Sequence, residues 1–186
     1  MEIIKTDIPD CYVINNSFIK DKRGTFSKIY SEELFKKKRI NPIFQECYYS
    51  ISYKNIVRGM HFQIPPYEED KLIFVTAGEI LDVVLDIRKN SPKYKKSFNI
   101  TLNHENKKSI YAPKGLAHGF LTLSDFATVV YLTTANYSKS HDKGIKWNSF
   151  GFDWGVNNPI ISERDMSFKP LSEFKTPFIF KRINKR

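Results

Sequence analysis

Residues 56–74, IVRGMHFQIPPYEEDKLIF, place three side chains capable of chemistry among apolar runs that are typical of strands. These are Arg58, His61 and Lys71, and His61 is one of only four histidines in the chain. A histidine with a near-neutral pKa can remove a proton, and a nearby cation can stabilise the negative charge that develops. A lone histidine on a strand is more often a packing residue, so the rest of the sequence must decide between the two interpretations.

The elements that would position these residues are predicted to be mostly strands. Short β-branched and aromatic segments such as CYVINNSFI, KLIFVTA, EILDVVLDI and TVVYLTTANY alternate with glycine- and proline-containing turns, which indicates an all-β sandwich or barrel. One segment, SEELFKKKRI, predicts a helix with Ser31 as N-cap, acids in the first turn and lysines at the end. From about residue 140 the pattern becomes irregular and contains prolines, which predicts a tail that packs across the barrel.

Length and composition narrow the class of protein. The 186 residues suit a single domain, with 41% hydrophobic residues and no apolar run long enough for a membrane span. The N-terminal MEIIKTDIPD does not have the apolar stretch of a signal peptide, so we expect a cytoplasmic protein. Two cysteines, Cys11 and Cys47, are too few for a disulfide framework or a cysteine-rich zinc site.

The formal net charge of +10 does not by itself indicate nucleic-acid binding. The lysines are spread along the whole chain, and no recognition helix, zinc finger or RNA-binding motif accompanies them. The two remaining explanations are a lysine-rich solvated surface and a pocket that binds an anionic ligand. We therefore expect no nucleic-acid partner.

A second histidine lies in APKGLAHGF, where Pro113, Gly115 and His118 form a P-x-G-x-x-H arrangement. This spacing resembles the second motif of the cupin superfamily, which consists of small double-sheet β-barrels of the jelly-roll type. Cupin metal enzymes also have an H-x-H pair in their first motif, and here that position reads His61-Phe62-Gln63. With one histidine of the pair missing, we expect no bound metal.

Seven segments in order extend this resemblance to a single family. They are DKRGTF, VRGMHFQ, KLIFVTAGEILDVVLDIRKNSP, APKGLAHGFLTLSD, VVYLTTANY, KGIKW and ISERD, and their order resembles that of the dTDP-4-dehydrorhamnose 3,5-epimerase family. The resemblance covers about residues 5–170, and a basic tail of about residues 171–186 follows. It implies one cupin domain over residues 1–186, a double-sheet jelly-roll barrel with one short N-terminal helix and an irregular C-terminal tail.

The resemblance also implies a reaction that uses no metal and no organic cofactor. The family consists of homodimers that invert carbons next to the 4-keto group of a nucleotide-linked 4-keto-6-deoxy sugar. In this chain His61 matches the base, and Asp165 matches the aspartate that orients its imidazole. Lys71 matches the lysine that supports charge on the keto oxygen, and Tyr131 matches the acid that returns a proton from the opposite face.

Further residues match positions that bind the substrate. Arg58 fits a diphosphate clamp, and His118 matches a pocket histidine close to the base. Phe26 and Tyr137 are candidates for stacking on the substrate, with ordinary packing as the alternative. In the family the segment that contains Arg23 reaches into the neighbouring active site, which implies an exchange of N-terminal strands in a homodimer.

The residues that would read the nucleotide base depart from the family pattern. Lys28 stands where the family usually has a glutamate, and Glu46-Cys47-Tyr48-Tyr49-Ser50 aligns with its usual Gln-Asp-Asn-His-Ser run. Lys28 is a charged donor and Glu46 only an acceptor, a pair that would suit cytosine or guanine. If these residues face solvent and the base is read by stacking on Tyr48 or Tyr137, a thymidine substrate remains equally compatible.

The expected function is therefore a nucleotide-sugar epimerase, acting on C3 and/or C5, in the synthesis of a surface polysaccharide such as capsule or lipopolysaccharide. Three alternatives remain open: a single-carbon epimerase on a CDP- or GDP-linked sugar, a non-catalytic carbohydrate-binding cupin, and a metal-dependent cupin oxygenase. The carbohydrate-binding alternative would be indicated by loss of His61, Lys71 or Tyr131, and all three residues are present.

Overall fold

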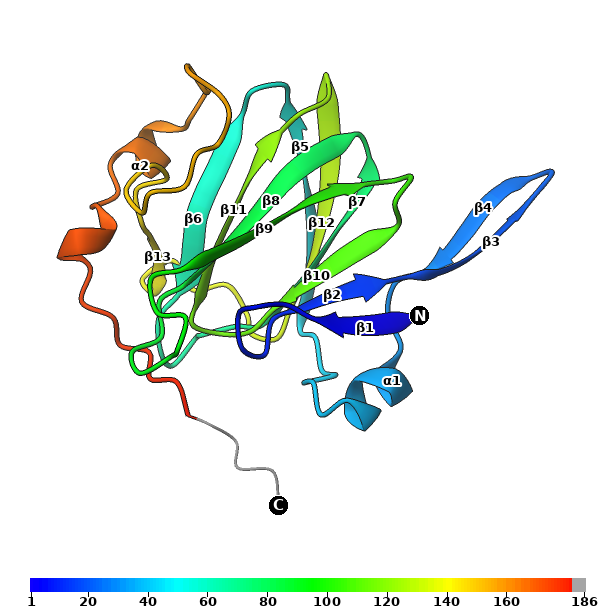
Figure 1. The fold of residues 1–186 in the computed structure, drawn as a ribbon, viewed down its shortest axis with the longest axis horizontal. Coiled ribbons are helices and arrows are strands. Elements are labelled where there is room, and N and C mark those ends of the chain that lie inside the picture. The colour runs from blue at the N-terminus through cyan, green and yellow to red at the C-terminus, as the bar shows by residue number, and fades with distance from the viewer. Residues whose placement is uncertain (182–186) are drawn as a thin grey trace.

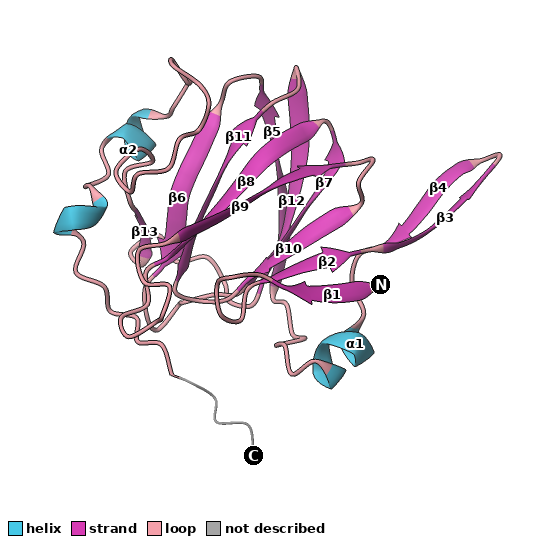
Figure 2. Ribbon diagram, in the orientation of Figure 1, coloured by secondary structure: helices cyan, strands magenta, loops and turns pink. Residues whose placement is uncertain are grey.

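The computed structural model describes residues 1–181, which form two facing antiparallel sheets in a jelly-roll barrel (Figures 1 and 2). The six-stranded sheet has the order β1 (Glu2–Lys5), β2 (Tyr12–Asn15), β10 (Lys108–Ala112), β7 (Lys71–Ala77), β12 (Phe126–Thr133) and β5 (Glu46–Tyr53). The five-stranded sheet has the order β13 (Asp142–Gly144), β6 (Val57–Gln63), β11 (Leu116–Thr122), β8 (Glu79–Asp86) and β9 (Ser97–Asn103). The predicted all-β cupin class is confirmed.

The space between the sheets is filled by the side chains that alternate inward along each strand. Ile73 and Val129 from the six-stranded sheet meet Val84 and Phe120 from the five-stranded sheet in one buried cluster. Burying each such side chain contributes about 1.5–3 kcal/mol. This alternation is clear in β12, where every second residue is buried, whereas β8 is buried along most of its length.

The C-terminal segment covers the outer face of the five-stranded sheet, as the sequence analysis predicted. Trp154, Leu171 and Phe178 pack against Phe62 and Leu85. Every residue of β11 is consequently buried. Two short elements that the sequence analysis did not predict lie in this segment, the helix α2 (Glu163–Met166) and the 3₁₀ turn η1 (Leu171–Glu173).

The predicted N-terminal helix is present as α1 (Glu32–Lys37). Its buried Phe35 packs edge-on against Tyr30, Phe44 and Tyr111 at one end of the barrel. Ser31 occupies the N-cap position, but within the described residues its side chain makes no capping hydrogen bond. The helix is therefore fixed by its apolar face and not by its cap. None of the helices among residues 1–181 is long and apolar enough to cross a membrane.

A hairpin of β3 (Ser17–Asp21) and β4 (Gly24–Lys28) projects away from the barrel as a separate two-stranded arm (Figure 1). All five residues of β3 are exposed. Phe18, Ile19 and Phe26 are 54%, 67% and 66% exposed. A two-stranded hairpin that exposes this much apolar surface is at best marginally stable in water by itself.

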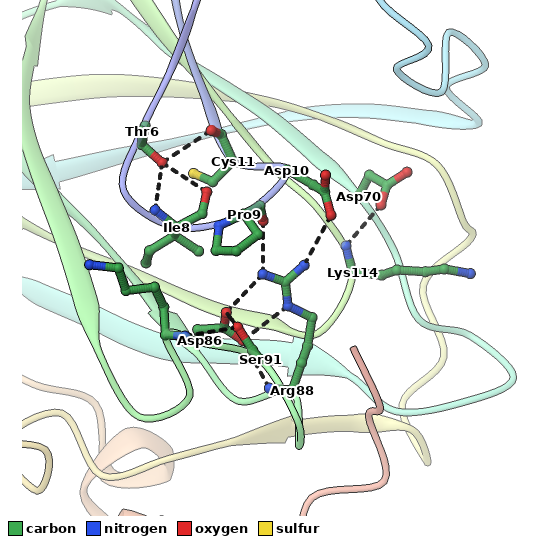
Figure 3. A network of polar contacts seen from close by, with 11 residues as sticks. Thr6, Ile8, Pro9, Asp10, Cys11, Asp70, Asp86, Arg88, Ser91 and Lys114 are labelled. Carbon is green, nitrogen blue, oxygen red and sulfur yellow. Dashed lines mark hydrogen bonds and ion pairs between the residues drawn. The ribbon is translucent and has the colours of Figure 1, made fainter. Parts of the chain in front are cut away.

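A buried polar network joins the N-terminal turn to the end of β8 (Figure 3). The Arg88 guanidinium donates to both carboxylate oxygens of Asp86, at 3.0 and 2.8 Å, and to the carbonyl oxygen of Pro9 at 2.8 Å. Gly115 lies against Arg88 with φ +81°, and a Cβ there would lie 2.5 Å from Arg88 Cγ. The glycine of the P-x-G-x-x-H motif is therefore required by backbone conformation and close packing.

Candidate active site

His61 and Asp165 form a hydrogen-bonded pair that joins β6 to α2. His61 Nε2 lies 2.8 Å from Asp165 Oδ1, and the Gly59 amide donates to Asp165 Oδ2 at 3.0 Å. Asp165 is held by its own backbone, since its amide donates to Ser162 Oγ at 3.1 Å in an N-cap. A carboxylate only accepts, so Nε2 carries the hydrogen and Nδ1 is left free to take a proton.

The surroundings of this pair favour an unprotonated imidazole beside a carboxylate. Burial lowers the pKa of His61 below its ordinary value, against the opposing effect of Asp165, and the positive charge of Lys71 lowers it further. Burial alone would raise the pKa of Asp165, but the hydrogen bonds from His61 and Gly59 outweigh it and the net pKa is lowered. At neutral pH the pair can therefore act as a base.

Tyr131 faces this pair from the opposite sheet. It lies on β12 in the six-stranded sheet, whereas His61 lies on β6 in the five-stranded sheet. Burial raises the pKa of Tyr131 well above that of an ordinary tyrosine, with partial opposition from a contact with Ser50. The phenol is consequently protonated at neutral pH and can donate a proton.

Lys71 opens β7 and is held by a carboxylate. Its Nζ lies 3.1 Å from Glu69 Oε1, and both side chains are almost completely buried. The other carboxylate oxygen of Glu69 accepts from Gln63 Nε2 at 3.0 Å. A buried ammonium tethered in this way can stabilise an anionic oxygen without having to reorganise first.

A pocket of about 380 Å³ brings His61 and Lys71 together, whereas Tyr131 and Asp165 do not line it but contact its residues Tyr48 and His61. It is lined by Glu46, Tyr48, His61, Gln63, Glu69, Lys71, Tyr137, Asp142 and Arg164. A larger hollow of about 710 Å³ lies beside the N-terminal strand and the end of α1, and it contains none of the predicted site residues. The smaller pocket is therefore the candidate active site.

Arg58 and His118 lie on the five-stranded sheet and do not line this pocket, but both are near Tyr131. Arg58 Nε donates to Ser52 Oγ at 2.8 Å. Burial raises the pKa of Tyr131, and the positive charge of Arg58 lowers it by a smaller amount. His118 pairs directly with His61 in the β11–β6 ladder. It is buried, it lies 2.7 Å from Asp82 Oδ2, and its ring meets Tyr131 edge-on with centroids 6.0 Å apart. Both residues are thus next to the predicted catalytic groups.

The structure brings Glu46, Tyr48 and Tyr137 into the pocket but keeps Lys28 apart. Glu46 Oε1 accepts the backbone N–H of Tyr137 at 3.1 Å. Lys28 is the last residue of β4 in the projecting hairpin and does not line the pocket that contains Glu46. The hairpin is seen in Figure 1.

Arg23 and Phe26 also lie on this hairpin. Arg23 is at its tip, where its guanidinium pairs with Asp21 at 2.6 Å, and its side chain is 84% exposed. The two residues line a separate hollow of about 430 Å³. They reach an active site only if the hairpin enters a second copy of the chain.

Four pocket residues were not predicted from the sequence as site residues: Gln63, Glu69, Asp142 and Arg164. Arg164 pairs with Asp142 at 2.7 Å and lies over the ring of Phe168, which in turn meets His61 edge-on. The sequence offers only one indication that these residues belong to the site, which is their position. Glu69 lies close to Lys71, and Arg164 is next to Asp165. An acid in a charged turn is usually solvated, so these residues are found only from the folded contacts.

Comparisons of the chain with known proteins agree on one family. The family described as dTDP-4-dehydrorhamnose 3,5-epimerase matches residues 5–173. A dTDP-4-dehydrorhamnose 3,5-epimerase of Shigella flexneri is 38% identical over 170 residues, which cover 90% of this chain and 94% of that protein. The crystal structure of the Sulfolobus tokodaii enzyme of the same name has a TM-score of 0.86 at 38% identity, covering 92% and 96% of the two chains. The Legionella pneumophila dTDP-6-deoxy-D-glucose-3,5-epimerase in complex with dTDP-4-keto-L-rhamnose has a TM-score of 0.89 at 31% identity, covering 94% of each chain.

Proposed function

The chain belongs to the dTDP-4-dehydrorhamnose 3,5-epimerase family, and on that premise we propose that it inverts C3 and/or C5 of a dTDP-linked 4-keto-6-deoxy sugar. The single observation that best supports this is the placement of a base and an acid on opposite sheets. The base is His61 with Asp165, and the acid is Tyr131. Inversion requires a proton to leave one face of a carbon and return to the other, which two such groups can perform.

The first step is the removal of a proton from a carbon next to the ketone. His61 Nδ1 takes this proton, and Asp165 stabilises the imidazolium that forms. The electron pair moves onto the keto oxygen, where the Lys71 ammonium stabilises the enolate. One donor aimed at such an oxygen contributes about 2.7–4 kcal/mol to the transition state.

The second step returns a proton to the opposite face. Tyr131 gives its phenolic proton to the carbon, and the enolate collapses to the ketone with inverted configuration. His61 then carries one extra proton and Tyr131 lacks one, and exchange with solvent restores both. A positioned acid or base contributes about 10²–10⁴-fold to such a step.

Deuterium uptake separates the two steps. With a dTDP-4-keto-6-deoxy sugar in heavy water, wild-type protein should incorporate deuterium and invert the carbon. His61→Ala should lose both, whereas Tyr131→Phe should retain exchange and lose inversion, because His61 can return a deuteron to the face it came from. Wild-type exchange rates in His61→Ala would show that this assignment of the base is wrong.

We infer that the base of the nucleotide is thymine. The relatives act on dTDP sugars by name, which does not favour the CDP- or GDP-linked alternative. Glu46 already uses one carboxylate oxygen for the Tyr137 amide, which leaves less of it for a base. Initial rates with dTDP-, CDP- and GDP-linked sugars test this, and a preference for either of the last two would restore a base-reading role for Lys28 and Glu46.

The alternatives of another class have less support. A carbohydrate-binding cupin without activity has no need of a buried His–Asp pair opposite a protonated tyrosine. A metal-dependent oxygenase would need the second histidine of the H-x-H pair as a ligand, and position 63 is glutamine. Metal independence stays a prediction, and turnover that survives prolonged chelation would support it.

A homodimer with exchanged N-terminal hairpins is part of the proposal. Besides the hairpin, the outer face of β5 exposes Tyr49, Ile51 and Tyr53 at 67%, 52% and 69%. β5 is also an open edge of its sheet. Exposed apolar patches and open edges of this kind mark interaction surfaces.

In such a dimer Arg23, at the tip of the hairpin, could hold the diphosphate bound by the second copy. Light scattering at micromolar concentration tests the association, and a fully active monomer would contradict it. A cytoplasmic location and a place in surface polysaccharide synthesis remain predictions, which cell fractionation and the glycan profile of a deletion strain would check.

A further inference from the structure

Tyr48 and Tyr131 form a stacked pair across two strands. They are directly opposed in the β5–β12 ladder, so both side chains lie on the same face of the six-stranded sheet. Their ring centroids are 5.0 Å apart with an interplanar angle of 21°. Tyr131 is 7% exposed and Tyr48 is 43% exposed, and Tyr48 also lines the pocket that contains His61 and Lys71.

The Tyr131 hydroxyl is only weakly anchored by hydrogen bonding. Among the described residues its hydrogen-bond neighbour is Ser50 Oγ, at 3.5 Å, which is the outer limit for such a bond. Buried tyrosines usually rely on a firm partner for the hydroxyl. The ring itself is better held, by the stacked face of Tyr48 and by the edge-on contact with His118.

The pKa of Tyr48 is raised, like that of Tyr131. Burial, and then the charges of Glu69, Glu46 and Asp142, raise the pKa of Tyr48. Both phenols in the stack are therefore uncharged at neutral pH.

We propose that Tyr48 is a positioning residue for proton return: its ring holds Tyr131 at the angle from which the phenol reaches the far face of the sugar. The inference rests on the proposed epimerase activity. Within residues 1–181 no hydrogen bond or ring contact joins Tyr48 to His61, so loss of the stack should leave proton removal intact. The predicted defect is consequently confined to inversion.

The test measures two rates on one sample. Deuterium uptake from heavy water reports proton removal, and the configuration of the recovered sugar reports inversion. The variants are Tyr48→Phe, which keeps the stack, Tyr48→Leu, which keeps apolar bulk, and Tyr48→Ala. Tyr94→Ala, in the loop between β8 and β9, is the control for removal of a partly buried tyrosine elsewhere.

Wild type and Tyr48→Phe should share one ratio of inversion to exchange. Tyr48→Leu and Tyr48→Ala should lower it by about tenfold or more, within the 100-fold that a 1 Å misplacement of a reacting group can cost. Tyr94→Ala should leave the ratio unchanged.

Three results would overturn the inference: a wild-type ratio in Tyr48→Leu, an equal loss in Tyr48→Phe, which would assign the effect to the hydroxyl, or a parallel fall of both rates. If wild type itself shows no exchange, the proposed function fails and not this inference. Should Tyr48→Ala not fold, Tyr48→Phe and Tyr48→Leu still decide the question.

Discussion

Asp165→Asn is the substitution whose effect follows most directly from the hydrogen bonds of the site. One carboxylate oxygen of Asp165 accepts from His61 Nε2 at 2.8 Å and the other from the Gly59 amide at 3.0 Å. An asparagine has one oxygen and one NH₂ group for these two donors. If its oxygen faces Gly59, its NH₂ faces His61 and forces the hydrogen onto Nδ1, where the base must be free. If its oxygen faces His61, its NH₂ group faces the Gly59 amide, and two N–H donors then lie against each other without an acceptor.

The magnitude follows from either orientation. The variant also lacks the negative charge that stabilises the imidazolium, and breaking a buried charge pair costs about 3–5 kcal/mol. At 1.36 kcal/mol per factor of ten, this corresponds to about a 10²–10⁴-fold loss in the rate of proton removal. The same exchange in the triad of serine proteases lowers the rate by about 10⁴-fold, also through the wrong tautomer.

The assay is deuterium uptake by the dTDP-linked sugar, at matched protein concentration and after circular dichroism has shown that the variant is folded. Folding should survive, because the Asp165 amide still donates to Ser162 Oγ. Asp153→Asn is the matched control, since Asp153 is exposed and caps a turn at Gly155 in the same C-terminal segment. A folded Asp165→Asn protein that exchanges within about tenfold of wild type would refute the dyad.

Three further outcomes are expected. Burial lowers the pKa of His61 below its ordinary value of 6.5, so the base stays unprotonated near neutrality. We therefore expect kcat/KM to be constant near neutral pH and to fall as the pH drops through that lowered pKa. A rate profile between about pH 5 and 8 would measure this. Lys71→Met should lower kcat by about 10²–10³-fold, with dTDP affinity much less changed. It should also lower Tm, because the buried Glu69 carboxylate keeps its hydrogen bond from Gln63 but loses its cation. Gly115→Ala should cost about 1–3 kcal/mol of stability, seen as a lower Tm, and leave both kinetic constants near wild type, since a Cβ at φ +81° would collide with Arg88.

The barrel could be predicted because its signal is local. Alternating burial marks β12 and a short apolar run marks β8, and the inward residues of both strands form part of the core. The helix α2 was not predicted because four residues carry no periodicity. It depends on the cap that Ser162 provides to Asp165 and on its place against β6.

From residue type alone, a site residue could be proposed only where that type is unusual on a strand, whereas Tyr131 and Asp165 were proposed from the family resemblance. His61 and Lys71 are conspicuous among apolar neighbours, whereas Glu69 belongs to an acidic turn that is typical of a solvated loop. Its burial depends on Gln63 and Lys71, which lie on different sheets. The stack of Tyr48 on Tyr131 likewise depends on the register of β5 against β12, which composition does not define.

The positions of the base and the acid on different sheets give the apolar core a role in stereochemistry. His61 and Tyr131 lie on facing sheets, and the distance between their strands is set by side chains such as Ile73, Val84 and Phe120 that pack between the two sheets. A core substitution that changes this spacing could leave the enzyme able to remove a proton from the substrate carbon but unable to return one to the opposite face. Selection for handedness of the product therefore acts on the same residues as selection for a well-packed interior, and divergence in product configuration can arise without any change in the catalytic groups.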